Sequence, residues 1–266
     1  MKSLRMDKLT IIKIGGNVID DEQKLASFLA DFSSLPNHKI LVHGGGKLAT
    51  RLAEQLNIPQ QMIDGRRITD AETLRIVTMV YAGYINKNIV ALLQSMGCNA
   101  LGLSGADGNV VLAHKRNRPG TDFGFAGDID NINHGLLERL ILQGFVPVIA
   151  PITHDGKGQL LNTNADTMTS EIARSLTAVF DVDIIYCFEK EGVLVDVEKE
   201  DSIITDLDAA YYNDLKNKGA IFAGMIPKLD NAFASIESGV KKVMIGKAEQ
   251  LHQVSKGEKG TSISHG

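Results

Sequence analysis

The stretch that decides the fold is Leu9-Thr10-Ile11-Ile12-Lys13-Ile14-Gly15-Gly16, and Lys39-Ile40-Leu41-Val42-His43-Gly44-Gly45-Gly46 repeats its plan. Each begins as a short apolar run, which predicts a buried strand. Each ends in glycines and leads into residues at helical spacing. The order of strand, glycine turn and helix is typical of a parallel sheet with helices packed on both faces.

The alternation of strand and helix continues to the end of the chain. Further strands are expected at 99–103, 145–150, 182–186, 241–245 and 260–264, and a hairpin at 110–115 and 123–129. Helical spacing marks 22–32, 47–56, 135–143, 165–176, 208–218 and 227–238, and a capping box starting at Thr69 opens a long helix to about Met96. The predicted fold class is α/β, a three-layer α/β/α sandwich with a mostly parallel open sheet. A lobe boundary is expected at 175–181, which divides the chain into 1–178 and 179–266.

The composition is that of an ordinary globular protein. The chain has 266 residues, of which 44% are hydrophobic and 23% charged, and its net charge is −4. This mild acidity argues against a nucleic-acid partner, which would need a basic surface. The two cysteines and seven scattered histidines form neither a disulfide framework nor a zinc-binding pattern. Neither a signal peptide nor a membrane helix is expected, so we expect a cytoplasmic protein with no membrane partner.

Glycine is concentrated where predicted strands end. Gly15 and Gly16 follow the first strand, residues 44–46 follow the second, and residues 102–105 surround the end of the third. The carboxyl ends of parallel strands share one sheet edge, where glycine N–H groups can approach an anion closely. Three such turns, one beside Lys13, favour a polyphosphate site over three simple tight turns. The P-loop, the Rossmann fingerprint and the protein-kinase signatures are missing, which excludes those nucleotide-binding classes.

Five motifs carry a family resemblance. They are Ile12-Lys13-Ile14-Gly15-Gly16, Val42-His43-Gly44-Gly45-Gly46, Asp64-Gly65-Arg66-Arg67-Ile68-Thr69, Asn162-Thr163-Asn164-Ala165-Asp166 and Gly224-Met225-Ile226-Pro227-Lys228. In this order they resemble the amino acid kinase family, and most closely its acetylglutamate branch, over residues 9–263. The resemblance implies transfer of the γ-phosphoryl group of MgATP to the side-chain carboxylate of an N-acyl-L-glutamate in arginine biosynthesis, with acetyl as the default acyl group.

The implied reaction needs positive charge more than it needs a base. A glutamate side chain has an ordinary pKa of about 4.3, so the acceptor carboxylate is already ionised at pH 7. The obstacle is the approach of two anions, and catalysis then rests on positioning and on cations placed over the transferring group. Magnesium is expected mainly through the ATP phosphates, and no metal site built from protein ligands is expected.

The resemblance also implies a role for each motif residue. Lys13 and Lys228 would flank the phosphoryl oxygens as catalytic residues, and Asp166 would hold both lysines in place. The residues implied to bind the acid substrate are Gly44, Gly45, Arg67 and Asn162. The residues implied to bind the ATP phosphates are Gly15, Gly16 and Gly46. Backbone N–H donors are expected from Gly16, Gly44 and Gly45.

Read without the resemblance, the same residues have simpler interpretations. Lys228 and Arg67 could be solvated surface charges, Asp166 a helix cap, and Asn162 a turn former. His43 is better explained as a structural histidine than as a catalytic one. Lys13 is different, because a lysine inside an apolar strand is costly to bury unless it has a partner.

The loop after the predicted strand at 182–186 departs from the family pattern. It reads Cys187-Phe188-Glu189-Lys190-Glu191-Gly192, with Glu189 where the family has Asp and Phe188 where it has a small polar residue. The corresponding loop in the family contacts the adenine and ribose side of the nucleotide. The resemblance therefore implies that Glu189 and Gly192 lie on the nucleotide side, with contacts that differ from the usual ones.

A basic cluster lies in the predicted hairpin, which corresponds to the family's lid over the acyl group. Lys115, Arg116 and Arg118 are expected to form a solvated turn. The alternative interpretation is that one of them pairs with an extra carboxylate, as an N-succinyl substrate would have.

Assembly and activity have alternatives too. Residues 1–8 are too short for the N-terminal helix through which arginine-inhibited relatives form hexamers, so a homodimer insensitive to arginine is expected. One rival is a kinase of the same fold acting on another acid, of which free glutamate is the nearest. Another is a non-catalytic sensor that binds an amino acid or a partner protein. The charge cluster Lys13, Asp166 and Lys228 argues against the sensor, because it is costly without chemistry to perform.

Overall fold

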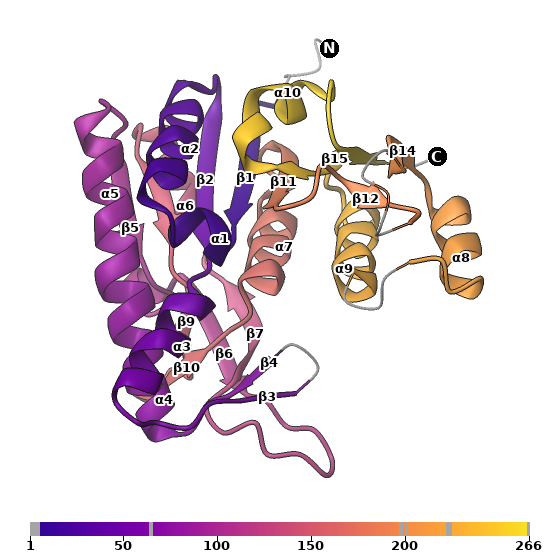
Figure 1. Cartoon of the computed structure of the whole chain (residues 1–266). Coiled ribbons are helices and arrows are strands. Elements are labelled where there is room, and N and C mark those ends of the chain that lie inside the picture. The colour runs from indigo at the N-terminus through magenta and orange to yellow at the C-terminus, as the bar shows by residue number, and fades with distance from the viewer. Residues whose placement is uncertain (1–5, 64–65, 197–198, 200–201, 222–224, 265–266) are drawn as a thin grey trace.

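The computed structural model describes residues 6–63, 66–196, 199, 202–221 and 225–264, and in it helices pack on both sides of a central sheet (Figure 1). The strands are β1 (Lys8–Ile14), β2 (His38–His43), β3 (Gln61–Ile63), β4 (Arg66–Ile68), β5 (Ala100–Leu103), β6 (Val111–Lys115), β7 (Gly127–Ile132), β8 (Val146–Ile149), β9 (Ile152–His154), β10 (Leu160–Asn162), β11 (Asp181–Phe188), β12 (Val193–Leu194), β13 (Ile203–Ile204), β14 (Asp206–Leu207), β15 (Lys242–Lys247) and β16 (Thr261–Ile263). The α-helices are α1 (Gly16–Ile19), α2 (Glu22–Ser34), α3 (Gly46–Gln55), α4 (Ala71–Val77), α5 (Asn86–Ser95), α6 (His134–Leu142), α7 (Ala165–Leu176), α8 (Ala209–Asn217), α9 (Ile226–Glu237) and α10 (Leu251–Lys256). A π-helix, η1 (Thr78–Ile85), joins α4 to α5, and short 3₁₀ turns cover Asp107–Asn109 and Ala248–Gln250.

The central sheet confirms the predicted mostly parallel arrangement. Its eight strands lie in the order β14-β16-β15-β11-β1-β2-β8-β5. Neighbours pair in parallel throughout, except for the antiparallel pair β15–β16. The strands β1, β2, β5 and β8 come from residues 1–178 and the other four from residues 179–266.

Alternating side chains of β1 enter two different cores, which confirms the three predicted layers. Leu9 and Ile11 are fully buried in a cluster that includes residues of α6, α7 and α9. Ile12 and Ile14 are fully buried in a second cluster that includes residues of α2, α3 and α5. Because side chains alternate along a strand, Lys13 points to the same side as Leu9 and Ile11, toward α7 and α9.

A second, four-stranded sheet lies beyond the carboxyl ends of β1 and β2, in the order β10-β9-β6-β7 (Figure 1). The predicted hairpin is its antiparallel pair β6–β7, although β7 begins at Gly127 and not at residue 123 as predicted. The antiparallel pair β3–β4 lies beside this sheet and is bridged to it through Thr69 and Gly124. The sequence analysis did not predict β3 and β4, because strands of three residues carry too little periodicity to detect.

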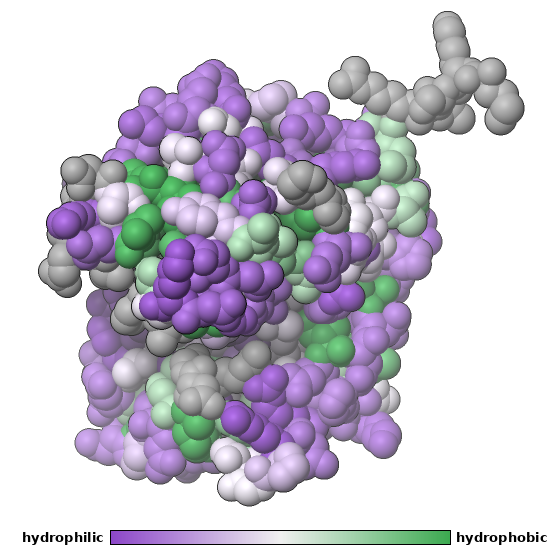
Figure 2. Space-filling model, turned by 90° about the vertical axis from the view of Figure 1, so that its right-hand side faces the viewer, coloured by the Kyte–Doolittle hydropathy of each residue, from purple (hydrophilic) through white to green (hydrophobic). Residues whose placement is uncertain are grey.

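The long helix predicted after Thr69 runs over Ala71–Ser95 but differs in two details. Its N-cap is Asp70, whose side chain accepts a hydrogen bond from the Thr73 N–H at 2.7 Å, and its middle turns are the π-helix η1. By length and composition it is the one helix among the described residues that could cross a membrane. Ile76, Ile85 and Ile89 are instead buried in the second core cluster. Hydrophilic residues also predominate on the face shown in Figure 2, where hydrophobic residues are exposed only in small patches.

Candidate active site

Two adjoining pockets open where β1 and β2 end. Pocket A is lined by Gly44, Gly45, Gly46, Met62, Arg67, Tyr81, Ala126, Gly127, Pro151, Asn162, Thr163, Asn164 and Ala165. Pocket B is lined by Lys13, Gly15, Gly16, Asn17, Val18, Lys47, Cys187, Phe188, Glu189, Lys190, Gly192, Met225 and Lys228. They meet at the glycine turns, where a Cβ on Gly44 would lie 3.9 Å from the Gly15 Cα.

An ion pair between Lys13 and Asp166 lies at this junction. Asn164 caps α7 by accepting a hydrogen bond from the Thr167 N–H at 2.9 Å, so Asp166 is in the first turn of the helix that faces β1. The Lys13 Nζ lies 2.8 Å from the Asp166 Oδ1, and the two side chains are only 10% and 15% exposed. Burial alone would raise the pKa of Asp166, but the Lys13 ammonium, with help from Lys228, holds it below its ordinary value. The carboxylate is therefore ionised at neutral pH.

Lys228 approaches the same point from the start of α9. Its Nζ lies 3.9 Å from the centroid of the Phe188 ring, and the Lys13 Nζ lies 5.5 Å from that centroid. Burial is the main cause that lowers the pKa of Lys228, and Lys13 adds to it, whereas Asp166 and Glu189 oppose the shift. The structure thus brings together the three side chains that the sequence analysis named as catalytic. Gly224, in the same motif as Lys228, lies outside the described residues.

Arg67 lies in the wall of pocket A, and the solvated-surface interpretation of it is wrong. Only 8% of the residue is exposed. One terminal nitrogen donates to the Gly46 carbonyl at 3.0 Å and to the Thr50 Oγ1 at 2.9 Å, and the other donates to the Gln60 Oε1. These bonds fix the plane of the guanidinium. The preceding motif residues Asp64 and Gly65 lie outside the described residues.

Asn162 reaches pocket A from the end of β10. Its side-chain amide donates to the Thr69 Oγ1 at 3.0 Å. Ala126 bridges to the backbone of Asn162, so the second sheet holds this residue from two sides. The Asn162 side chain retains hydrogen-bonding capacity at the pocket wall, because an amide has two donor hydrogens and an acceptor oxygen.

The glycine turn after β2 has backbone requirements of its own. Gly45 has φ of 149°, and a Cβ there would lie 2.3 Å from the Ile85 Cδ1. The Gly44 N–H donates to the Ile14 carbonyl at 2.9 Å, so the expectation that it serves as a free anion donor is wrong. Gly46 begins α3 and lines pocket A with Gly44 and Gly45, rather than pocket B with Gly15 and Gly16.

The third glycine-rich strand end does not join the site. Residues 102–105 span the end of β5 (Ala100–Leu103), which lies at one end of the strand order of the central sheet. They line neither pocket A nor pocket B. Gly105 is buried, and a Cβ there would lie 2.8 Å from the Val111 carbonyl oxygen. This turn therefore packs against the second sheet, and the prediction of three converging turns is wrong for one of them.

Pocket B holds the residues that the sequence analysis placed on the nucleotide side. Gly15 caps α1 and Gly16 begins it, and Glu189 and Gly192 lie across the pocket. The Glu189 Oε1 forms an exposed ion pair with the Lys47 Nζ at 3.6 Å. Cys187 lines the same pocket but is buried, and this burial raises the pKa of its thiol to about 12.

Tyr81 and Gly127 line pocket A but were not predicted as site residues from the sequence. Tyr81 projects from η1, and burial raises the pKa of its phenol although the Arg67 guanidinium beside it opposes the shift. Gly127 starts β7, where a Cβ would lie 2.9 Å from both the Leu161 Cβ and the Thr163 Oγ1. A glycine inside a predicted strand and a single tyrosine in an apolar helix were the available signals.

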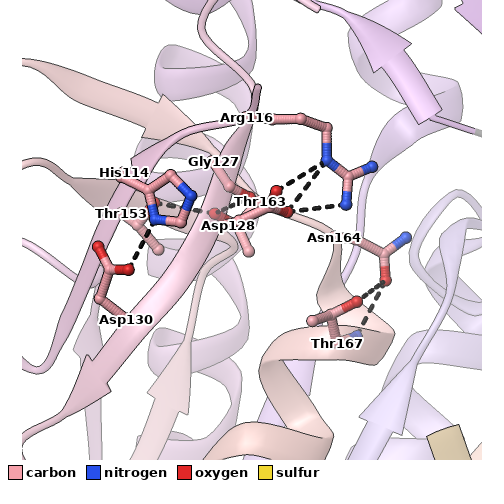
Figure 3. Close-up of polar contacts among 9 residues, drawn as sticks. All are labelled: His114, Arg116, Gly127, Asp128, Asp130, Thr153, Thr163, Asn164 and Thr167. Atoms are coloured by element: carbon pink, nitrogen blue, oxygen red, sulfur yellow. Dashed lines mark hydrogen bonds and ion pairs between the residues drawn. The ribbon is translucent and has the colours of Figure 1, made fainter. Parts of the chain in front are cut away.

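The basic residues of the hairpin are largely neutralised by neighbouring carboxylates. Arg116 forms ion pairs with both carboxylate oxygens of Asp128, at 2.8–3.1 Å, and it lies over the Phe123 ring. Lys115 is half exposed and lies 3.3 Å from Asp122. Figure 3 shows the Arg116–Asp128 ion pair and, close to it, a second contact in which the His114 Nδ1 lies 2.6 Å from the Asp130 Oδ1. The solvated-turn interpretation therefore fits Lys115, whereas Arg116 is packed and paired.

His43 has the structural role that the sequence analysis preferred. It is fully buried between β2 and α5. Its Nδ1 lies 2.8 Å from the Gly44 carbonyl, and its Nε2 lies 3.2 Å from the Asn86 amide nitrogen. Burial lowers its pKa to about 4, so the ring is neutral at pH 7. In the described part of the chain, no group of three His, Cys, Asp or Glu residues could hold a metal ion.

Comparison with known proteins decides the family. Residues 8–247 match the model of the amino acid kinase family. The chain belongs to the amino acid kinase family. Among curated members, it is 57% identical to the acetylglutamate kinase of Cytophaga hutchinsonii over 247 residues, which cover 92% of this chain and 94% of that protein. It is 53% identical to the acetylglutamate kinase of Phocaeicola vulgatus, with coverage of 94% and 97%.

A solved structure shares the amino acid kinase fold of this chain. The N-acetylglutamate synthase of Neisseria gonorrhoeae, complexed with coenzyme A and N-acetyl-glutamate, superposes with a TM-score of 0.83. The match covers 97% of this chain and 60% of that one, at 22% identity. At this identity the likeness establishes the fold alone. The predicted family and fold class are both confirmed.

Proposed function

We propose that this protein transfers the γ-phosphoryl group of MgATP to the side-chain carboxylate of N-acetyl-L-glutamate, in arginine biosynthesis. The observation that carries the proposal is the cluster of Lys13, Asp166 and Lys228 at the junction of pockets A and B. Two anions must meet in this reaction, and two ammonium groups stand where they would meet. Curated relatives at 50–57% identity that carry the name acetylglutamate kinase support the choice of substrates.

Lys13 and Lys228 would act as the catalytic cations. Neither needs to lose a proton, since each would stabilise charge on the oxygens of the transferring group. Asp166 would hold Lys13 at the end of β1, where the strand aims its ammonium at the junction. No general base is required, because the acceptor carboxylate is ionised at neutral pH.

Pocket A would hold the acid. The buried guanidinium of Arg67 is held in a fixed plane and would attract the α-carboxylate through its charge and its remaining N–H donors, and Asn162 adds an amide on the same pocket wall. Gly44 and Gly45 allow the acid to approach the turn closely, since side chains there would fill the space. Free glutamate carries a charged α-amino group, for which the residues lining pocket A offer no carboxylate.

Pocket B would hold MgATP. Gly15 and Gly16 at the start of α1 would approach the phosphates. Gly46, at the start of α3, lines pocket A and would lie on the acid side of the junction. Magnesium would enter with the nucleotide and keep most of its contacts to phosphate and water. The base and ribose would extend toward Glu189 and Gly192. In this arrangement residues 1–178 supply the acid-binding lobe and residues 179–266 the ATP-binding lobe.

We also propose that two copies assemble in the cytoplasm into a homodimer through the acid-binding lobe. Among the described strands, β5 forms one edge of the central sheet, and the helix Ala71–Ser95 beside it exposes Met79 and Tyr84 by more than half. An unpaired edge and exposed apolar side chains favour association. Sedimentation should give the mass of two subunits, with or without arginine, and a mass of six would refute the dimer.

The activity is tested by trapping the acyl phosphate with hydroxylamine. Purified protein and MgATP are offered N-acetyl-, N-succinyl- and free L-glutamate in parallel, without any partner protein. The proposal predicts that the N-acetyl acid gives hydroxamate fastest. A preference for the N-succinyl acid would keep the chemistry and change the acyl group. No product from any acid, with nucleotide binding retained, would favour a sensor.

A further inference from the structure

The aromatic ring of Phe188 lines pocket B. It ends β11 and lies on the same side of the strand as Tyr186, two residues earlier. The two rings are stacked with centroids 6.1 Å apart and planes 4° apart. The Tyr186 hydroxyl lies 2.7 Å from the Ser170 Oγ on α7, which anchors the lower ring. The Phe188 ring therefore has little freedom to turn.

Both lysines of the site lie over this ring. The Lys228 Nζ is 3.9 Å and the Lys13 Nζ 5.5 Å from the ring centroid. Lys13 is level with Tyr186 in the parallel pair β1–β11, so its side chain and the two rings share one face of the sheet. A cation within about 6 Å of a ring centroid is attracted to the face of the ring, and the attraction is stronger where water is excluded.

The two lysines differ in their other partners. Lys13 has Asp166 at 2.8 Å. In the part of the chain that the structure describes, no carboxylate oxygen lies within ion-pair distance of the Lys228 Nζ. The charged groups that face Lys228 are Lys13 on β1, Asp166 on α7 and Glu189 after β11, and Glu189 is itself paired with Lys47. The Phe188 ring is thus the immediate neighbour of the half-buried Lys228 ammonium, which the nearby Lys13 ammonium repels.

We propose that Phe188 is a positioning residue for Lys228, whose ammonium its ring holds in the charged form at the junction of the two pockets. The proposal rests on the proposed phosphoryl transfer for its effect on rate, but its effect on Lys228 is independent of that reaction.

An aromatic ring suits this task better than a second carboxylate would. A carboxylate beside Lys228 would neutralise the ammonium and would repel the phosphates of ATP. A ring face stabilises the cation through its quadrupole without adding negative charge. Lys228 then stays protonated and remains free to turn toward a phosphoryl oxygen, while Lys13 is held by Asp166.

The first test distinguishes the effect of the aromatic ring of Phe188 from the effect of its volume. Phe188→Leu and Phe188→Met both keep an apolar side chain but remove the aromatic ring, and the Met side chain is the more flexible of the two. Phe188→Tyr keeps an aromatic ring. The proposal predicts that kcat falls about tenfold in Phe188→Leu and Phe188→Met, which is about 1.4 kcal/mol of barrier. The KM for the acid should stay within about twofold, and Phe188→Tyr should match the wild type. Phe233→Leu is the matched control, because Phe233 also stacks on a tyrosine, at 4.9 Å, whereas the ring over which Lys13 and Lys228 lie is that of Phe188.

The second test needs no activity. Lysines labelled with ¹³C at Cε are titrated by NMR, with Lys228→Arg used to assign the Lys228 signal. The Lys228 pKa should drop by about 0.5 unit or more in Phe188→Leu and stay unchanged in Phe188→Tyr and Phe233→Leu. An unchanged Lys228 pKa in Phe188→Leu and Phe188→Met, with melting temperatures near that of the wild type, would overturn the proposal. If the wild type gave no acyl phosphate, the proposed function would fail and this titration would still decide the role of Phe188.

Discussion

Replacing Asp166 by Asn tests the ion pair that organises the site. The two side chains are nearly equal in size, so packing in the first turn of α7 is kept while one charge is removed. Lys13 then retains its ammonium in a place where only 10% of its side chain is exposed, and Asp166 is its one ion-pair partner among the described residues. The variant converts a compensated pair into a nearly buried, unpaired cation.

The magnitude follows from the separation and the burial. Two unit charges 2.8 Å apart attract by about 6 kcal/mol at an effective dielectric constant of about 20. The Asn amide oxygen still accepts a hydrogen bond and recovers part of this. We therefore expect Asp166→Asn to lower the free energy of unfolding by about 3 kcal/mol, at the low end for breaking a buried pair. The kcat should fall by about 100-fold or more, because Lys13 is no longer held at the junction.

The pH dependence has a definite sign. Although burial opposes it, Lys13 holds the pKa of Asp166 below its ordinary value of 3.8 in the folded protein. The pair therefore contributes stability that is fully present above the unfolded pKa and is lost as the pH falls through the lower, folded pKa. The difference in stability between wild type and Asp166→Asn should be constant from pH 7 to 5 and should shrink below pH 4.

Urea unfolding at several pH values and the hydroxamate assay at pH 7 measure these effects. Asp214→Asn is the matched control, because Asp214 pairs with Lys218 at 2.6 Å but both side chains are about half exposed or more. It should change stability by less than about 0.5 kcal/mol and leave kcat unchanged. If Asp166→Asn behaved like this control, the electrostatic account of the site would be refuted.

Three further substitutions test other parts of the site. Arg67→Lys keeps the charge but loses the planar guanidinium that donates to Gly46 and Thr50. The KM for the acid should rise about tenfold or more, while the KM for ATP does not change. Equal rises in both KM values would contradict the assignment of Arg67 to the acid-binding pocket. Gly45→Ala places a methyl group 2.3 Å from the Ile85 Cδ1 at φ of 149°, and it should lower the free energy of unfolding in urea by about 1–3 kcal/mol; a neutral effect would show that η1 yields freely. Burial lowers the folded-state pKa of His43 to about 4, so below pH 6.5 protons bind the unfolded chain more tightly than the folded one. Between pH 7 and 5 the free energy of unfolding of the wild type should fall by roughly 2 kcal/mol more than that of His43→Gln. Equal pH dependence of the free energy of unfolding in the two proteins would contradict this expectation.

The central layer of the fold was predictable because buried parallel strands leave a strong signal. Runs such as Ile11–Ile14 and Ile40–Val42 cannot be read as half-exposed strands, and the glycines that follow them mark the turns. The short strands β3, β12 and β14 were missed, since two or three residues show no period. The π-helix η1 was missed for a different reason. It continues the apolar spacing of the helix, so the sequence pattern does not distinguish it from an α-helix, and in the structure its residues Tyr81 and Ile85 lie against Gly45.

The site was predictable where a residue conflicts with its local surroundings. Lys13 in an apolar strand demanded a partner, and the structure supplies Asp166. The packing of Arg67 could not be foreseen, because it depends on how the chain brings Gly46 and Thr50, 21 and 17 residues away, and Gln60, seven residues away, around the guanidinium. The third glycine turn, at residues 102–105, was placed wrongly, because spacing along the chain does not reveal that β5 lies at the far edge of the sheet.

One measurement tests the central claim most directly. N-Acetyl-L-glutamate labelled with ¹³C at the side-chain carboxyl carbon is incubated with the wild-type protein and MgATP, and the products are followed by ³¹P NMR. The account predicts a new phosphorus signal split by coupling to the labelled carbon, which shows the phosphoryl group on that carboxylate. ADP and inorganic phosphate with no coupled signal, or no turnover at all, would contradict it.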